Sequence, residues 1–264
     1  MSATLSARSL THHYRGHGFR GRRRTLPALH DLSLTVSAGD SIGLVGSSGA
    51  GKSTLLRSLL ALERPASGTV VFNERPVAPG SASSLRWYRR LVQYVPQNPA
   101  SSLDPSMDVR RLLLEPLKQL GIAGDHHTMI NRALERVELE RGVLRCKPGQ
   151  LSGGQNQRVA IARALVPSPS ILLADEPVSG LDLPLRNTVL AVLGQLVNRD
   201  GLGLLFVSHD LGAVSLLCSR TVVLSGGSIV EQGPTAELFR DARHPATREL
   251  IASIPRRGSK AGNK

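Results

Sequence analysis

Two short stretches carry side chains whose types and spacing suit chemistry on phosphate groups. The first, GSSGAGKST at residues 46–54, fits the pattern G-x-x-x-x-G-K-[ST]. Its glycines let successive backbone N–H groups turn toward a phosphate, while Lys52 would reach the β and γ phosphates and the Ser53 hydroxyl would ligate Mg²⁺. The second, ILLADEP, places Asp175 and Glu176 after an apolar run. There Asp175 would orient Mg²⁺ through its water shell, and Glu176 would polarise an attacking water.

A third stretch, QLSGGQNQRVAIARAL at residues 150–165, predicts another anion site. Ser152 is a typical N-cap, and Gly153 and Gly154 leave backbone N–H groups bare where the helix begins. A nucleotide has a single γ-phosphate, which the 46–54 loop already holds, so we expect this helix to serve a nucleotide held by another subunit.

Each stretch taken singly also fits a simpler interpretation. These are a glycine-rich turn, an acidic pair in a loop after a strand, and an ordinary capped helix. The interpretation as an ordinary capped helix does not explain the two adjacent glycines at its start, because glycine lowers helix stability.

These residues need elements to position them, and hydrophobic periodicity predicts the first of those elements. Alternation at residues 32–36 indicates a half-buried strand, Gly39-Asp40 a turn, and 42–45 a short apolar strand before the glycine-rich loop. From Lys52 the leucines recur at helical spacing. The order is therefore strand, loop, helix, as a phosphate-binding loop requires. Residues 5–14 are interpreted as a further strand.

The second half of the chain predicts a parallel sheet. The runs 171–177 and 202–210 are nearly all apolar and end in charged residues, as strands buried on both faces do. Residues 184–198 between them have helical character, so the alternation indicates an α/β architecture. Residues 105–165 have helical spacing and few strand signals. Residues 221–233 are predicted to form a hairpin that turns at Gly226-Gly227, with one or two short helices after Pro234.

Composition bounds the class of protein. Of 264 residues, 41% are apolar, which fits a globular protein with a sizeable core, and no internal repeat is present. The net charge of +13 suits nucleic acid, anionic lipid or a phosphate ligand, although most such charges coat a solvated surface. No apolar run is long enough to span a bilayer, and a signal-peptide pattern is lacking. Cys146 and Cys218 lie far apart, which argues against a disulfide scaffold or zinc ribbon and fits a reducing, cytosolic compartment.

LSGGQ, standing after the glycine-rich loop and before the acidic strand end, resembles the signature of the ATP-binding subunits of ABC transporters. Three more elements of the family are present, and all of the motifs occur in the family's order. Gln97 in QYVPQNP resembles the glutamine-loop residue that touches Mg²⁺ and faces the transmembrane subunit, Asp182 in SGLD the dimer-contacting aspartate, and His209 in FVSHD the switch histidine at the γ-phosphate. Together the motifs cover most of residues 5–232.

The resemblance implies a fold and a domain division. The expected fold is an α/β P-loop NTPase with a RecA-like core, an antiparallel β subdomain and a helical insertion subdomain at about residues 98–165. The ATP-binding domain would span residues 1–232. Residues 233–264 would form a family-type C-terminal extension with a disordered end.

The resemblance also implies the site. Two such subunits would close head to tail around two ATP molecules, with Mg²⁺ at each. Glu176, His209 and Lys52 would be catalytic, and Asp182 would contact the partner. The residues implied to bind ATP are Tyr14, Gly46, Ser47, Ser48, Gly49, Ala50, Gly51, Lys52, Ser53, Thr54 and Gln97. Those implied to reach the partner's nucleotide are Leu151, Ser152, Gly153, Gly154 and Gln155. Those implied to hold Mg²⁺ are Ser53, Gln97 and Asp175.

The stretch YVPQNPASSLDPSMDV and the tail ELFRDARHPATRELIASIP resemble the peptide and nickel uptake branch of the family. Within it, the stretch LTHHYRGHGFRGRRRTLPAL at residues 10–29 most resembles the second of the two paralogous ATPases of nickel importers. The implied function is ATP-driven uptake of nickel or a metal chelate, with dipeptide or oligopeptide import as the alternative. The implied partners are a paralogous ATPase, two permeases and an extracytoplasmic binding protein. The implied location is the cytoplasmic face of the bacterial inner membrane, peripheral to it.

Residues 10–29 invite a metal site because three histidines gather there. If residues 5–14 form a strand, however, His12 and His13 point to opposite faces and cannot share an ion. Tyr14 is the residue that we expect to matter, because in this family an aromatic at the end of the first strand stacks on adenine. Residues 15–24 are then a basic hairpin in solvent, with anionic lipid headgroups as a possible neighbour.

Two other classes of protein share some of these features. A nucleic-acid ATPase of the same family would fit the basic charge, but it usually carries two ATPase units or a long coiled coil, and neither is found. A small-molecule phosphotransferase shares the glycine-rich loop but has no use for LSGGQ. We therefore expect no nucleic-acid partner.

Overall fold

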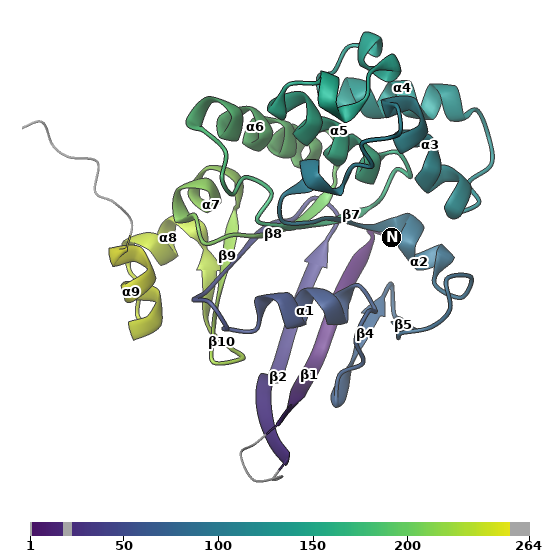
Figure 1. Cartoon of the computed structure of the whole chain (residues 1–264). Coiled ribbons are helices and arrows are strands. Elements are labelled where there is room, and N and C mark those ends of the chain that lie inside the picture. The colour runs from purple at the N-terminus through teal and green to yellow at the C-terminus, as the bar shows by residue number, and fades with distance from the viewer. Residues whose placement is uncertain (1, 18–22, 254–264) are drawn as a thin grey trace, which may run out of the picture.

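The computed structural model of the chain describes residues 2–17 and 23–253 (Figure 1). Part of the basic loop at 15–24 and the tail from residue 254 lie outside the described residues, so the hypotheses on solvent-exposed arginines and a disordered end are not addressed. Within the described residues, no helix has both the length and the apolar character needed to cross a membrane.

A four-stranded antiparallel sheet is built from the N-terminal part of the chain, in the order β2-β1-β4-β5. Its strands are β1 (Thr4–His17), β2 (Arg23–Ser37), β4 (Ser67–Phe72) and β5 (Arg75–Val77). The alternation predicted at residues 32–36 is confirmed, since Leu32, Leu34 and Val36 are buried and the residues between them are exposed.

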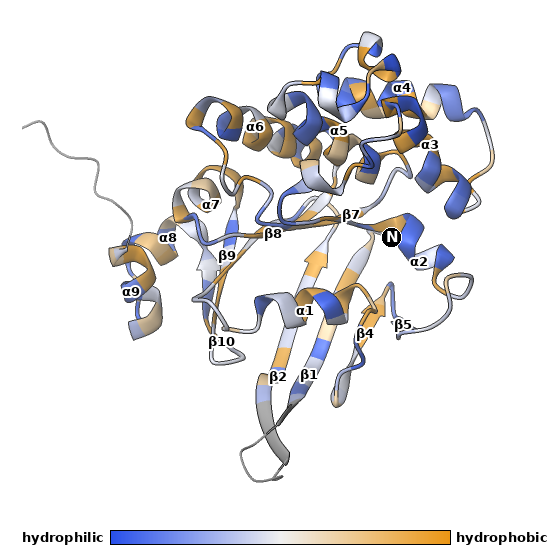
Figure 2. Ribbon diagram, in the orientation of Figure 1, coloured by the Kyte–Doolittle hydropathy of each residue, from blue (hydrophilic) through white to orange (hydrophobic). Residues whose placement is uncertain are grey.

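A six-stranded sheet forms the centre of the molecule, in the order β10-β9-β3-β8-β7-β6. All neighbouring pairs are parallel except β10 with β9, which form the predicted hairpin at Gly226-Gly227. The strands are β3 (Ser41–Val45), β6 (Val92–Val95), β7 (Ile171–Asp175), β8 (Gly203–Val207), β9 (Arg220–Ser225) and β10 (Ser228–Pro234). Figure 2 shows the hydrophobic character of β7 and β8, which the sequence pattern predicts for strands covered on both faces.

Alternate residues of this sheet belong to two separate cores. The first core lies between the two sheets and around α1 (Lys52–Leu59), and the second lies under the helices on the opposite face. The first takes, among others, Ile42, Leu44, Leu173, Leu205 and Val222, and the second takes Val45, Leu172, Phe206 and Val223. The α/β class is thereby confirmed, and the strands β3, β7, β8 and β9 pack both of their faces against these cores.

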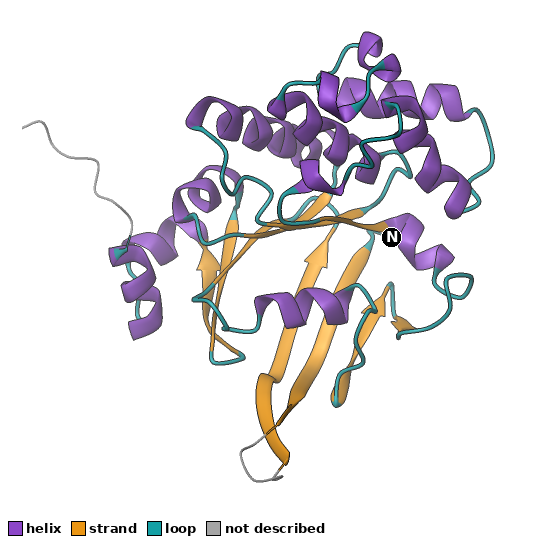
Figure 3. Ribbon diagram, viewed as in Figure 1, coloured by secondary structure: helices purple, strands orange, loops and turns teal. Residues whose placement is uncertain are grey.

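Helices occupy residues 99–165 between β6 and β7 in place of strands (Figure 3). The α-helices are α3 (Val109–Gln119), α4 (His126–Arg136) and α5 (Gly153–Leu165), joined by 3₁₀ turns at Pro99–Ser102, Arg141–Arg145 and Pro148–Gln150. In Figure 1 they lie beside α6 (Leu183–Asp200), on the side of the central sheet away from β1 and β2. This segment is the expected helical insertion; its status as a separate subdomain stays a proposal.

The remaining helices are short. They are α2 (Arg86–Leu91), α7 (Leu211–Leu217), α8 (Thr235–Arg240) and α9 (Pro245–Ala252). The carboxylate of Glu231 on β10 ties down the start of α9, accepting from the backbone N–H groups of Arg243 at 2.9 Å and His244 at 3.0 Å. The last helix is therefore anchored to the central sheet rather than trailing from it.

Candidate active site

The glycine-rich loop connects β3 to α1 at the carboxyl edge of the central sheet. Gly51 is the N-cap of α1 with a φ of 109°, so the first N–H groups of the helix point into the loop. A Cβ on Gly51 would lie 2.6 Å from the carbonyl oxygen of Ala28 on β2. Both the left-handed backbone and the close approach of β2 therefore require glycine at this position.

Lys52 lies across the mouth of this loop. Its Nζ donates to the carbonyl oxygens of Gly46 at 2.7 Å and Ser47 at 2.9 Å. Burial lowers the pKa of the Lys52 ammonium below its usual value, while the carboxylates of Glu176 and Asp175 oppose that shift. The ammonium is thus held at the loop by weakly basic carbonyls, which phosphate oxygens can replace as stronger acceptors.

Asp175 is the last residue of β7 and is half-buried. The hydroxyl of Tyr94, on the neighbouring strand β6, donates to its Oδ2 at 3.2 Å. Burial raises the pKa of the Asp175 carboxyl, and the Tyr94 hydrogen bond opposes this shift. Burial and the same carboxylate raise the pKa of Tyr94 to about 12. Tyr94 was not foreseen from the sequence, since only the pairing of β6 with β7 brings the two residues together.

Glu176 follows Asp175 with a left-handed backbone, at a φ of 46°. Its Oε1 lies 3.0 Å from Nδ1 of His209, and its Oε2 accepts from Nε2 of Gln97 at 3.2 Å. These three side chains come from the loops after β7, β8 and β6. The carboxylate is therefore held from two sides by residues that the sequence singled out separately.

One cavity of about 670 Å³ connects these groups. Its lining combines the glycine-rich loop, the acidic strand end, Gln97, His209 and Tyr14. The full set is Tyr14, Pro27, Ala28, Gly46, Ser47, Ser48, Gly49, Gly51, Lys52, Ser53, Thr54, Gln97, Asp175, Glu176, His209, Leu250 and Ser253. Leu250 lies in α9 and Ser253 directly follows it, and no sequence pattern connects either residue with the site.

The three residues that the resemblance implies as Mg²⁺ ligands all line this cavity and carry side-chain oxygens. They are the hydroxyl of Ser53, the amide of Gln97 and the carboxylate of Asp175, whose Oδ2 alone bonds Tyr94. Oxygen donors of this kind suit a hard cation such as Mg²⁺. The donor set therefore fits the metal that the resemblance implies.

Tyr14 stands at the edge of the cavity and is 37% exposed. Its hydroxyl donates to Oε2 of Glu63 at 2.8 Å and lies 3.2 Å from the hydroxyl oxygen of Thr54. His12 is buried while its neighbour His13 is exposed, as the strand geometry predicts. The two histidines thus face opposite sides of β1.

The signature residues lie elsewhere on the same chain. Ser152 caps α5 in a capping box, accepting from the backbone N–H of Gln155 at 3.2 Å while its own N–H donates to Gln155 Oε1 at 2.9 Å. A Cβ on Gly154 would lie 2.6 Å from Cδ1 at the end of the Leu185 side chain, so α5 lies close to α6 at this glycine. Gly153 has no such neighbour and is exposed. None of the signature residues lines the cavity.

Asp182 is exposed and caps α6 by accepting from the backbone N–H of Leu185 at 3.0 Å. Among the residues that the structure describes, Asp182 is not part of the cavity lining. The expected site residues therefore divide into two groups on this chain: one around the glycine-rich loop, and one at the exposed starts of α5 and α6. Chemically, the first group can bind a polyphosphate and hold a carboxylate beside its terminal phosphate.

Comparison with known proteins finds similar chains that match over most of this one. The family model described as ABC transporter matches residues 29–179. A putative peptide import ATP-binding protein of Brucella ovis is 40% identical over 253 residues, covering 95% of this chain and 78% of the relative. The nickel import ATP-binding protein NikE of Rhodospirillum rubrum is 40% identical over 256 residues, covering 96% and 92%. The dimeric ATP-binding cassette MJ0796 bound to ADP and Pi superposes with a TM-score of 0.74 at 28% identity, covering 88% of this chain and 98% of that one.

Proposed function

The chain belongs to the ABC transporter family, and from this premise we propose that it is the ATP-hydrolysing subunit of a membrane importer for nickel or a metal chelate. The observation that carries the proposal is the convergence of the glycine-rich loop, Asp175, Glu176, Gln97 and His209 on one cavity. Relatives named for peptide import and for nickel import are equally similar, at 40% identity. Import of a dipeptide or oligopeptide is therefore the second candidate.

In this proposal the chain's own residues act on ATP as follows. The loop Gly46–Thr54 wraps the phosphates with its backbone N–H groups, and Lys52 turns from the Gly46 and Ser47 carbonyls to the β and γ oxygens. Glu176, held by His209 and Gln97, orients the attacking water and accepts its proton. Mg²⁺, when bound by Ser53, Asp175 and Gln97, would neutralise charge on the phosphates.

Tyr14 is proposed to stack on the adenine. Its ring borders the cavity and is partly exposed, while its hydroxyl is occupied by protein partners. An aromatic ring of this kind is a platform for any purine face and loses little entropy on binding.

The signature Leu151–Gln155 and Asp182 are proposed to complete the site of a second ATPase subunit. They are not part of their own chain's cavity, and the similar cassette MJ0796 is described as a dimer. We propose that the second subunit is a paralogue, as the resemblance to the nickel and peptide branch implies. The division into an ATP-binding domain at residues 1–232 and an extension at 233–264 is kept as part of this proposal.

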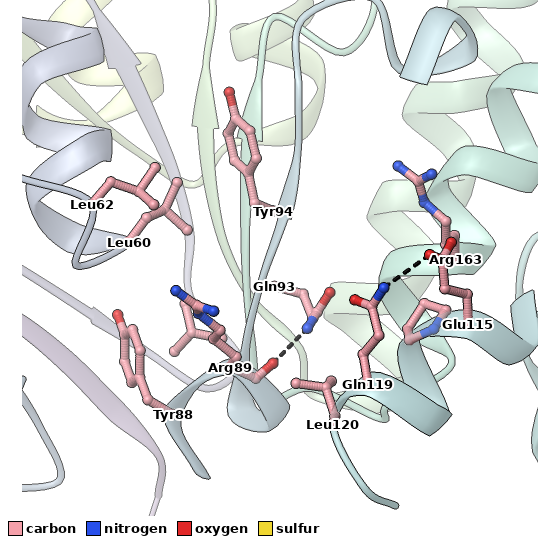
Figure 4. Close-up of a pocket in the computed structure, with 12 residues that line it drawn as sticks. Leu60, Leu62, Tyr88, Arg89, Gln93, Tyr94, Glu115, Gln119, Leu120 and Arg163 are labelled. Carbon is pink, nitrogen blue, oxygen red and sulfur yellow. Dashed lines mark hydrogen bonds between the residues drawn. The ribbon is translucent and has the colours of Figure 1, made fainter. Parts of the chain in front are cut away.

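A second groove is proposed as the docking site for a permease segment. It has a volume of about 400 Å³ and lies between the central sheet and the helices (Figure 4). In Figure 4, Leu60, Leu62 and Tyr88 face Glu115, Gln119 and Arg163 across it, with Gln93 and Tyr94 between. The Tyr94 hydroxyl donates to Asp175 in the active site, and Gln97 lies three residues after Tyr94. A permease segment seated in this groove would therefore contact a strand that leads directly to the active site. This docking would place the chain at the cytoplasmic face of the bacterial inner membrane.

The catalytic assignment predicts that Glu176→Gln retains ATP binding and loses most of the turnover of the assembled transporter, by about 100-fold or more, because a general base contributes on this order. Glu237→Gln on the exposed face of α8 is the matched control and should hydrolyse at the parental rate. Hydrolysis by Glu176→Gln at the parental rate would remove Glu176 from its role. Uptake of labelled nickel against labelled dipeptide, in cells with and without the chain, decides between the two cargo classes.

A further inference from the structure

Glu63 carries an inference that deepens the proposed site. This residue lies in the loop after α1, outside every motif, and its side chain is 27% exposed. Three side chains from two elements converge on its carboxylate. Oε2 accepts from the Tyr14 hydroxyl at 2.8 Å and lies 3.4 Å from Nε2 of His12, while Oε1 accepts from Nη1 of Arg57 at 3.1 Å. We propose that Glu63 is a positioning residue that fixes the Tyr14 ring for adenine, which rests on the proposed stacking role of Tyr14.

The Tyr14 side chain is held both at its hydroxyl and at its ring. Its oxygen lies 3.2 Å from the buried hydroxyl of Thr54 in the glycine-rich loop, so the ring is tied to the element that binds the phosphates. The His12 ring packs against it with centroids 4.8 Å apart and planes tilted by 49°. Two contacts at the hydroxyl and one at the ring restrict the rotation of the tyrosine before any base arrives.

His12 supports the same arrangement from inside the sheet. It is 7% exposed, and within the described part of the chain its Nδ1 has no hydrogen-bond partner. In the described residues, the charged group nearest to its ring is the Glu63 carboxylate, 3.4 Å from Nε2, and the same carboxylate accepts from the exposed tyrosine. The carboxylate thus links two residues of β1 to the segment after α1.

A purely structural role explains these contacts less well. Arg57 is 55% exposed, and an ion pair this exposed contributes little to folding. The second oxygen of the Glu63 carboxylate accepts a hydrogen bond from the exposed Tyr14. Because this bond already restricts the Tyr14 ring, the ring loses less conformational entropy when a base binds. Immobilising one side chain in advance is worth about threefold to tenfold in affinity.

The test measures the dissociation constants of ATP and of inorganic tripolyphosphate for the full chain. Glu63→Ala and Tyr14→Phe should each raise the dissociation constant of ATP by about threefold to tenfold. The double variant should be no weaker than the weaker single variant, because both changes remove one interaction. Tripolyphosphate has no base, so its affinity should not change. Glu63→Gln should recover part of the loss, since its amide oxygen still accepts from the tyrosine. In the assembled transporter, KM for ATP should rise while kcat stays at the parental value.

The controls separate this inference from the proposed function. Glu237→Ala on α8 should bind both ligands as the parent does. If Tyr14→Ala weakens ATP while Glu63→Ala does not, Glu63 has no positioning role and the adenine platform stands. An equal loss of tripolyphosphate affinity in Glu63→Ala would mean general damage to the loop and would overturn the inference. If neither Tyr14→Ala nor Glu63→Ala alters ATP binding while Lys52→Ala abolishes it, both the platform and its support are wrong, and ATP binding stands.

Discussion

At the scale of single residues, the most informative feature is the backbone of Glu176. A glutamate at a φ of 46° pays a local strain that only surrounding structure can maintain. Here its backbone N–H donates to the carbonyl of Val207 at 2.8 Å, which locks the turn against β8. The strained turn aims the carboxylate at His209 and Gln97 rather than into solvent, so the strain coincides with the group proposed to do the chemistry.

Cys218 gives a prediction on reactivity. It is 5% exposed, and burial raises the pKa of its thiol to about 12. Since alkylation requires the thiolate, a raised pKa means that almost none reacts at pH 8. We expect iodoacetamide to add one label to the native chain, at the partly exposed Cys146, and two labels after unfolding in urea, counted by mass spectrometry. Cys146→Ser should take up no label while folded, and two labels on the native parent would show that Cys218 is accessible.

The residues of the site divide by how they can be found. Lys52, Asp175 and Glu176 follow from local spacing, because a glycine-rich loop and an acidic strand end are patterns with a chemical reason. Glu63 and Tyr94 carry no such pattern. Their partners are 49 and 81 residues away in the chain, at Tyr14 and Asp175, so only the tertiary arrangement reveals them.

At the scale of elements, Ser152 at the start of α5 has two roles that can be tested separately: it caps the helix, and it is proposed to bind the nucleotide of a second subunit. Ser152→Ala removes one partner of the capping box and should lower the free energy of unfolding by about 1 kcal/mol, measured in urea. ATP affinity of the isolated chain should not change, because Ser152 lies outside its cavity. ATPase activity of the assembled transporter should fall by more than this small destabilisation explains.

Asp125→Ala provides the matched control for that variant. Asp125 caps α4 by accepting from the backbone N–H groups of His127 and Thr128, and it carries no proposed role in trans. It should lose similar stability and keep full ATPase activity. Equal activity losses in both variants would reduce Ser152 to a cap.

Some elements were predictable from pattern and others were not. β3, β7 and β8 are continuous apolar runs because both faces are buried, and their positions match the prediction. β6 has four residues, of which two are buried, and α2 buries only Tyr88, so neither carries a periodic signal. The edge strand β6 owes its existence to pairing with β7, which lies far along the sequence. That pairing is what places Gln97 opposite Glu176.

At the scale of the whole molecule, the groove in Figure 4 predicts how the chain reaches the membrane. Leu62 is 59% exposed on its wall, so Leu62→Glu would place a charge against any apolar segment seated there. We expect this variant to bind ATP with the parental affinity and to recover at least tenfold less permease on co-purification. Leu216→Glu on α7 is the control, because Leu216 is also an exposed leucine, at 73%, and this variant should recover permease as the parent does. Full recovery by Leu62→Glu would move the docking site elsewhere.

The cavity residues and the signature residues lie in different places on the chain, so the proposed ATPase site combines residues from two subunits. The glycine-rich loop and Glu176 line the cavity, while Ser152 and Asp182 are exposed and lie outside it, which supports the proposal that a second subunit completes the site. Glu176→Gln slows hydrolysis, so with ATP present this variant should accumulate the closed arrangement in which the two subunits hold ATP between them. If the partner is a paralogue, the variant alone should stay monomeric with ATP in light scattering, and should form a 1:1 complex only when the paralogous ATPase is added. Adding Ser152→Arg should abolish the complex by blocking the signature face. A tight ATP-dependent homodimer of the variant alone would contradict the paralogue assignment and leave the composite site intact.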